Sequence, residues 1–108
     1  SPEAFKDLFF QYYPVFFTFA RSLVDDKASA TQLTMEAMSM LWLKKADITG
    51  DINNRAFLYR TIRNNALNYL KHLQRHPDAG IYAGEVRMDS FLPQDILREI
   101  QDYVAREI

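Results

Sequence analysis

The sequence predicts an all-α protein, a compact bundle of three to four helices followed by a linker and a further C-terminal helix. Three observations indicate this class: apolar residues recur at helical spacing, no segment sustains strand-like alternation, and only three glycines occur in 108 residues. A chain of this length forms a single core. We therefore assign the bundle to residues 1–76, the linker to residues 77–92 and the last helix to residues 93–108.

The first helix is predicted over residues 2–24. Pro2 suits a first helical turn, and an apolar stripe follows it: Phe5, Leu8, Phe9, Tyr12, Tyr13, Phe16, Phe17 and Ala20. Pro14 interrupts this stripe, and a proline inside a helix removes a hydrogen bond and crowds the preceding turn. We expect a break or kink near Tyr13, and so either one bent helix or two.

The second helix is predicted over residues 27–45, with Asp25 or Asp26 as its N-cap. Its apolar residues, several of them methionines, extend almost around the helix. Such a helix is either fully buried or bound to a partner. Methionine serves both purposes, but full burial is difficult in a small domain, so the helix as a whole favours a partner. A polar loop is predicted after it, at residues 47–53.

The third helix, predicted over residues 54–73 with Asn53 or Asn54 as its cap, has an unusual charge balance. Residues 52–77 contain five basic residues and no acidic one, whereas the rest of the chain has eight basic and fourteen acidic residues. One sector of this helix is apolar and is predicted to be buried: Leu58, Tyr59, Ile62, Ala66, Tyr69, Leu70 and Leu73. The opposite sector is polar: Arg60, Asn64, Asn68, Lys71 and Arg75.

The polar sector has the chemistry of a nucleic-acid interface. Arginine and lysine suit phosphates, and asparagine can hydrogen-bond a phosphate or a base edge. The alternative is a solvated surface, which is the usual explanation of a charged face and leaves only a protein-binding helical module. A solvated face normally mixes both signs of charge, and here no acid is interleaved. The helix alone leaves both interpretations open.

Other kinds of site are not indicated. The chain has no cysteine, and it contains no Gly-rich phosphate loop and no catalytic set, so we predict no cofactor and no enzyme activity. His72 and His76 have a spacing that can bind a metal, but no thiolate or carboxylate accompanies them, so we predict no metal. No apolar run is long enough to span a bilayer, so we predict no membrane insertion.

Three segments, taken together, resemble one protein family. Residues 5–14, an aromatic run that ends in proline, are similar to conserved region 2.1 of bacterial extracytoplasmic-function sigma factors. Residues 26–42 resemble region 2.2 in the spacing of their acidic, small and aromatic positions, and residues 54–71 resemble regions 2.3 and 2.4. Three short matches in the same order and spacing form a specific pattern over about residues 4–75. Residues 93–108 resemble the start of region 4, which they leave incomplete.

The resemblance implies a cytoplasmic protein of transcription initiation that binds core RNA polymerase through the clamp helices of its largest subunit. Region 2.2 makes this contact, and the positions that match its contact face are Gln32, Met35, Glu36 and Ser39. Gln32 and Met35 replace the usual Asp and Gln, which weakens the electrostatic part of the contact. An anti-sigma factor is a further partner that the resemblance suggests.

Regions 2.3 and 2.4 of this family bind and melt the −10 promoter element, and the loop before the helix accepts a flipped base of the non-template strand. The matching positions, with Arg75 added from the same helix face, are Asp51, Asn53, Asn54, Arg55, Arg60, Arg63, Asn64, Asn68, Lys71 and Arg75. Asn53 and Asn54 are expected to select the base, since an amide presents both a donor and an acceptor. Phe57, Tyr59 and Tyr69 are candidates for stacking on bases, although each is more typical of a core position.

Overall fold

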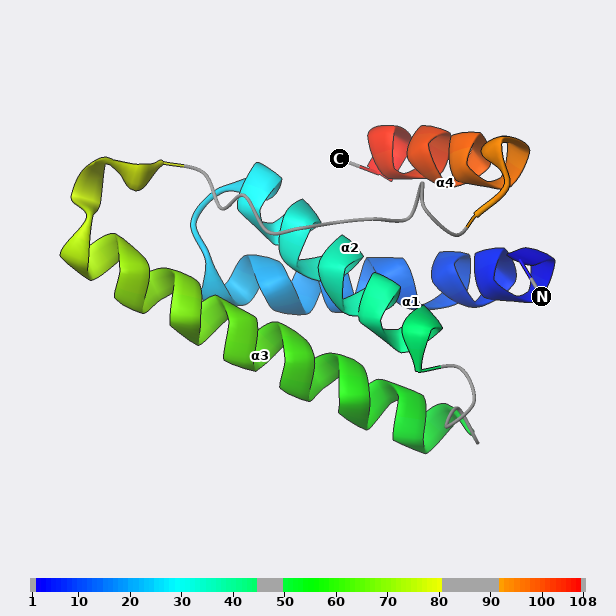
Figure 1. Ribbon diagram of the computed structural model, residues 1–108, viewed down its shortest axis with the longest axis horizontal. Coiled ribbons are helices and arrows are strands. Elements are labelled where there is room, and N and C mark those ends of the chain that lie inside the picture. The colour runs from blue at the N-terminus through cyan, green and yellow to red at the C-terminus, as the bar shows by residue number, and fades with distance from the viewer. Residues whose placement is uncertain (1, 45–49, 81–91, 108) are drawn as a thin grey trace.

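The computed structural model describes residues 2–44, 50–80 and 92–107, and within these ranges every element is helical (Figure 1). The elements are α1 (Pro2–Leu23), α2 (Lys27–Leu43), α3 (Asp51–Arg75), the short 3-10 turn η2 (Pro77–Ala79) and α4 (Gln94–Glu107). The all-α prediction is confirmed. The first part of the predicted loop at residues 47–53, and most of the predicted linker, lie outside the described residues.

Helix α1 is the centre of the bundle, because it contacts each of the other three α-helices. Helix α2 crosses it, α3 packs against both, and α4 lies along the N-terminal half of α1 (Figure 1). The predicted stripe of α1 is confirmed as core, with Phe5, Phe9, Tyr13 and Phe16 almost fully buried. The rings of Phe9 and Tyr13 stack with their centres 5.2 Å apart, as is favourable for neighbouring aromatic side chains.

Pro14 does not divide α1 into two helices, so that alternative is wrong. Proline has no N–H, so the carbonyl of Phe10 loses its usual partner one turn later in the helix. That carbonyl instead accepts a hydrogen bond of 3.3 Å from the hydroxyl of Tyr103 in α4. The Tyr103 ring also stacks on the Phe10 ring at 4.5 Å. A contact from a distant part of the chain thus compensates for the proline.

The predicted N-cap of the second helix is confirmed as Asp26. Its carboxylate accepts a hydrogen bond of 2.7 Å from the backbone N–H of Ser29, which satisfies one of the free donors of the first turn. Immediately before it, Arg21 donates to the backbone carbonyls of Val24 and Asp25. These local bonds fix the tight corner between α1 and α2.

Helix α3 differs from its prediction in length and in register. It begins three residues earlier, at Asp51, and its N-cap is Gly50, which makes no side-chain capping bond, so the prediction of an asparagine cap is wrong. Its buried residues are Asn54, Leu58, Thr61, Ile62, Ala66 and Tyr69. Tyr59 and Leu70, which were predicted to be buried, are exposed. The neighbouring helices therefore cover a narrower apolar sector than helical periodicity alone indicated.

Candidate nucleic-acid interface

The predicted cationic sector of α3 lies on the outside of the bundle. Six of its predicted DNA-binding residues are exposed: Arg60, Arg63, Asn64, Asn68, Lys71 and Arg75. After Asp51 the helix contains no acidic residue. Helical spacing of about four residues places Arg60, Asn64 and Lys71 in one row along the helix. Such a row of cations and amides can contact successive phosphates of a nucleic acid.

A pocket of about 270 Å³ opens where the C-terminal end of α2 meets the first turns of α3. Its lining consists of Leu41, Lys44, Asn53, Asn54, Ala56, Phe57 and Arg60. The Nζ atom of Lys44 lies 5.4 Å from the centre of the Phe57 ring. Two cations, two amides and one aromatic ring at a single opening suit a flat polar group attached to a phosphate, which is the chemistry of a nucleotide.

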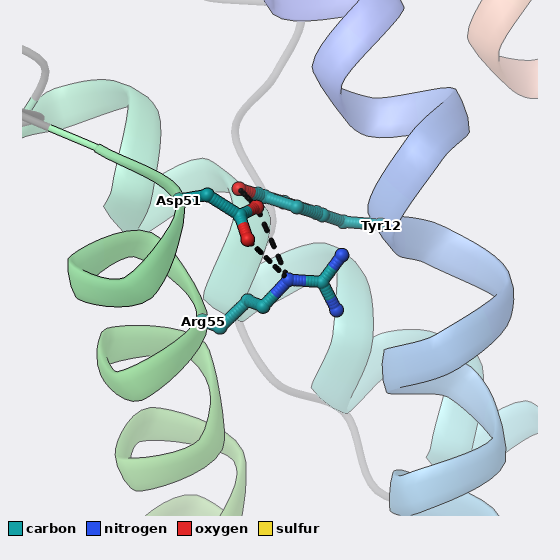
Figure 2. A network of polar contacts seen from close by, with 3 residues as sticks. All are labelled: Tyr12, Asp51 and Arg55. Carbon is teal, nitrogen blue, oxygen red and sulfur yellow. Dashed lines mark hydrogen bonds and ion pairs between the residues drawn. The ribbon is translucent and has the colours of Figure 1, made fainter.

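The first turn of α3 is tied to α1 by a polar network of three residues (Figure 2). The hydroxyl of Tyr12 donates to Oδ1 of Asp51 at 2.5 Å. The Nε atom of Arg55 donates to both carboxylate oxygens of Asp51, at 3.1 Å to Oδ1 and 2.9 Å to Oδ2. The guanidinium carbon of Arg55 also lies 5.0 Å from the centre of the Tyr12 ring, within the range of a cation–π contact.

The network favours the neutral form of the Tyr12 hydroxyl and the ionised form of the Asp51 carboxyl. Burial raises the pKa of the Tyr12 hydroxyl, and its hydrogen bond to Asp51 raises that pKa further. The same bond from Tyr12 lowers the pKa of the Asp51 carboxyl, as does the neighbouring Arg55. A neutral phenol and an ionised carboxylate therefore face each other, and the carboxylate holds the guanidinium.

The structure corrects the prediction that the polar loop continues through residues 51–53. These residues form the first turn of α3 and give their side chains different surroundings. Asn53 is exposed at the pocket, whereas Asn54 lines the pocket but is only 5% exposed. Of this pair, only Asn53 is exposed to solvent. Both oxygens of Asp51 already accept hydrogen bonds within the protein.

The residues predicted to contact polymerase lie on α2 with different degrees of burial. Gln32, Met35 and Glu36 are half-buried, and Ser39 is only 6% exposed. The hydroxyl of Ser39 donates to the backbone carbonyl of Met35 at 2.9 Å. Oε1 of Glu36 accepts a hydrogen bond of 2.8 Å from the Asn65 amide of α3. Three of the four predicted side chains therefore reach the surface of α2, and one of those three also contacts α3.

Sequence reasoning missed three residues that the structure brings to these sites. Lys44 lines the pocket, Tyr12 holds Asp51, and Asn65 bonds Glu36. Each acts across a contact between two helices, so neither helical periodicity nor local spacing identifies it. The only available sequence signal was the basic side chain of Lys44 next to the predicted loop.

His72 and His76, near the end of α3, have no third side chain beside them in the described residues that could complete a metal site. The rings of His72 and His76 lie 4.8 Å apart. Within residues 2–44, 50–80 and 92–107, no group of three or more His, Cys, Asp or Glu side chains is placed to hold a metal ion. The pair sits in and just beyond the last turn of α3, where a positive charge is favourable to the helix dipole.

Comparison with protein families now identifies the class of this protein. The family described as Sigma-70 region 2 matches residues 8–76, which include α1 from Leu8 onward and the whole of α2 and α3. The chain belongs to this family, and so is a domain of the sigma factors that act in transcription initiation. The bundle in Figure 1 is the helical fold expected of such a domain.

The match ends before α4, so the assignment of residues 93–108 to region 4 remains a prediction. Comparison with curated proteins and with solved structures found no match. No helix in the described part of the chain has the length and apolar character needed to cross a membrane.

Proposed function

We propose that this domain binds core RNA polymerase through α2 and recognises and melts the −10 promoter element through α3. One observation carries the proposal: the acid-free cationic face of α3 leads to the pocket beside its first turn. Arg60 belongs to both features, since it lines the pocket and begins the exposed row. A strand that follows the row therefore reaches the pocket without leaving the positively charged surface.

The exposed row of α3 and the pocket have different roles in recognition. Arg60, Lys71 and their neighbours bind phosphates, and this contribution is independent of sequence. The pocket receives one unstacked base of the non-template strand, and the exposed amide of Asn53 tests its edge. Unstacking a base costs a few kcal/mol. The cationic face and the pocket offset that cost only on the melted strand, so they favour melting.

The proposal extends to the partners and to the finer class. We place the protein among the extracytoplasmic-function sigma factors, with α4 as the start of region 4, and in the cytoplasm, where its polymerase acts. Gln32, Met35 and Glu36 are the side chains on α2 that can meet the polymerase clamp helices. An anti-sigma factor is a further partner in this proposal. None of these roles requires a catalytic group or a cofactor.

The test reconstitutes the chain with core RNA polymerase and measures binding to a library of single strands randomised at the −10 element. We expect the complex to retain selected non-template strands that polymerase alone does not retain, and to bind them less tightly as salt rises. Binding to polymerase without any gain in DNA retention would instead identify a protein-binding helical module. Failure to bind polymerase would refute the proposal for α2.

A further inference from the structure

The first turn of α3 carries recognition residues but has little support of its own. Its N-cap, Gly50, makes no side-chain bond to the helix. Ile52, the apolar residue of this turn, is 83% exposed and adds almost no burial. A helix end without a side-chain cap tends to fray. The turn that presents Asn53 and Arg55 therefore depends on contacts from outside the helix.

Tyr12 supplies a contact of this kind from α1. Its side chain is only 2% exposed, and its ring packs edge-on against Phe16 with the ring centres 5.8 Å apart. The rest of the core thus fixes the position of its hydroxyl, which binds Asp51. A rigid phenol bonded to a carboxylate is a charge-assisted hydrogen bond, the stronger kind. It holds the first turn of α3 to the body of the protein.

The same network orients Arg55. Both of its bonds to Asp51 use Nε, and its guanidinium lies over the Tyr12 ring. Figure 2 shows the two terminal nitrogens of Arg55 pointing away from Asp51. A guanidinium has five N–H donors, so the four on the terminal nitrogens are not needed for the bonds to the carboxylate. An arginine held in one orientation loses less entropy when it binds a phosphate.

We propose that Tyr12 is a positioning residue for DNA recognition: through Asp51 it fixes the first turn of α3 and aims the terminal nitrogens of Arg55 at a phosphate. This inference rests on the proposed function of the domain. It also changes the role predicted for Asp51. An acid next to a phosphate is repelled by it, so Asp51 acts on DNA through Arg55 and not by direct contact. The position of the first turn of α3, which carries the recognition residues, therefore depends on Tyr12, a buried residue of α1.

The test is a double-mutant cycle on DNA binding by the complex with core polymerase, using Tyr12→Phe, Arg55→Ala and the double variant. We expect Tyr12→Phe to weaken binding of a selected −10 strand by about three- to tenfold, which is less than the full value of one charge-assisted bond because Tyr12 acts on DNA only indirectly. We expect Arg55→Ala to reduce the salt dependence by about one unit. In the Arg55→Ala background, removal of the Tyr12 hydroxyl should weaken DNA binding by less than about a further twofold.

Tyr103→Phe is the matched control, because it also removes one hydroxyl that bonds another helix, at the Phe10 carbonyl. It should leave DNA affinity unchanged. If the losses of DNA-binding free energy in Tyr12→Phe and Arg55→Ala simply add in the double variant, the proposal is overturned and Tyr12 is a purely structural residue. Wild-type DNA affinity in Tyr12→Phe would overturn it as well. If the wild-type complex itself fails to bind any −10 strand, the proposed function fails instead, and the two failures are distinguishable.

Discussion

Helices α2 and α3 use their surfaces in opposite ways. Nine of the 17 residues of α2 are buried, against six of the 25 residues of α3. Helix α2 buries small polar residues as well, and their hydroxyls are satisfied within the bundle: Thr34 donates to the Ala30 carbonyl, and Ser29 lies 3.3 Å from the Tyr69 hydroxyl. Helix α3 exposes its other cations, Arg60, Arg63, Lys71 and Arg75, to water, whereas Arg55 is half-buried. One helix is mainly a component of the core, and the other is mainly a surface.

Because of this difference, substitutions in α2 and in α3 should affect different properties of the protein. A side chain of α2 that is removed leaves a cavity or an unpaired group in the core, which lowers stability. A cation of α3 that is removed leaves the fold almost intact but weakens the contact with a polyanion. The two helices meet at the pocket, whose lining comes from both. The following predictions separate the two kinds of effect.

The largest effect is expected at the end of α2. Trp42 is buried, and its ring packs edge-on against Phe5 with the centres 4.9 Å apart. Trp42→Ala should lower the free energy of unfolding by about 3–5 kcal/mol. Leu43→Ala is the control, because Leu43 is 70% exposed and its loss should cost less than about 0.5 kcal/mol. Urea denaturation measures both. Similar values for the two variants would place Trp42 outside the core.

The next effect separates two adjacent amides in the first turn of α3. Asn54 is buried and Asn53 is exposed. Asn54→Ala should destabilise the fold by about 1–3 kcal/mol, because it removes a buried amide that hydrogen-bonds the Tyr12 hydroxyl. Asn53→Ala should hardly change stability but should change which −10 bases are tolerated. Transcription from a library randomised at the −10 element measures the second effect. An unaltered base profile in Asn53→Ala would move base selection away from this turn.

A smaller effect is expected on the exposed face of α3. Arg60→Ala and Lys71→Ala should each lower the salt dependence of DNA binding by about one unit, roughly equally for all sequences. Their melting temperatures should stay close to that of the wild type, because neither side chain is buried. Arg98→Ala, which removes an exposed cation from α4, is the control and should leave the salt dependence unchanged. An unchanged slope in both α3 variants would refute the assignment of this face.

The smallest effect is the pH dependence of the contact between α1 and α3. In the folded protein, the hydrogen bond from Tyr12 and the neighbouring Arg55 lower the pKa of Asp51 from its ordinary value, so its ionised form stabilises the fold at neutral pH. This contribution is lost as pH falls through the lowered pKa. The difference in melting temperature between the wild type and Asp51→Asn should therefore be largest near neutral pH and vanish in strong acid. A difference that is constant over this pH range would show that the charge of Asp51 does not stabilise the contact.

Helix positions were largely available from the sequence, because they depend on local patterns. The apolar stripe of α1 predicted its buried face, and an aspartate before an apolar run predicted the cap of α2. The acid-free segment predicted an exposed cationic side for α3, which the structure confirms as exposed. These features arise from periodicity, capping and charge within a few turns of one helix.

Only the tertiary structure decided how the helices complete one another. It fixed the narrower buried sector of α3, which leaves Tyr59 and Leu70 exposed. It satisfied the Phe10 carbonyl, which Pro14 leaves without a helical partner, with the hydroxyl of Tyr103, a residue 93 positions away in the chain. It bonded Asp51 to Tyr12 and buried Asn54 beside the exposed Asn53. The reason is physical. These outcomes depend on how closely side chains of different helices approach one another, and a periodic pattern within one helix carries no information about that distance.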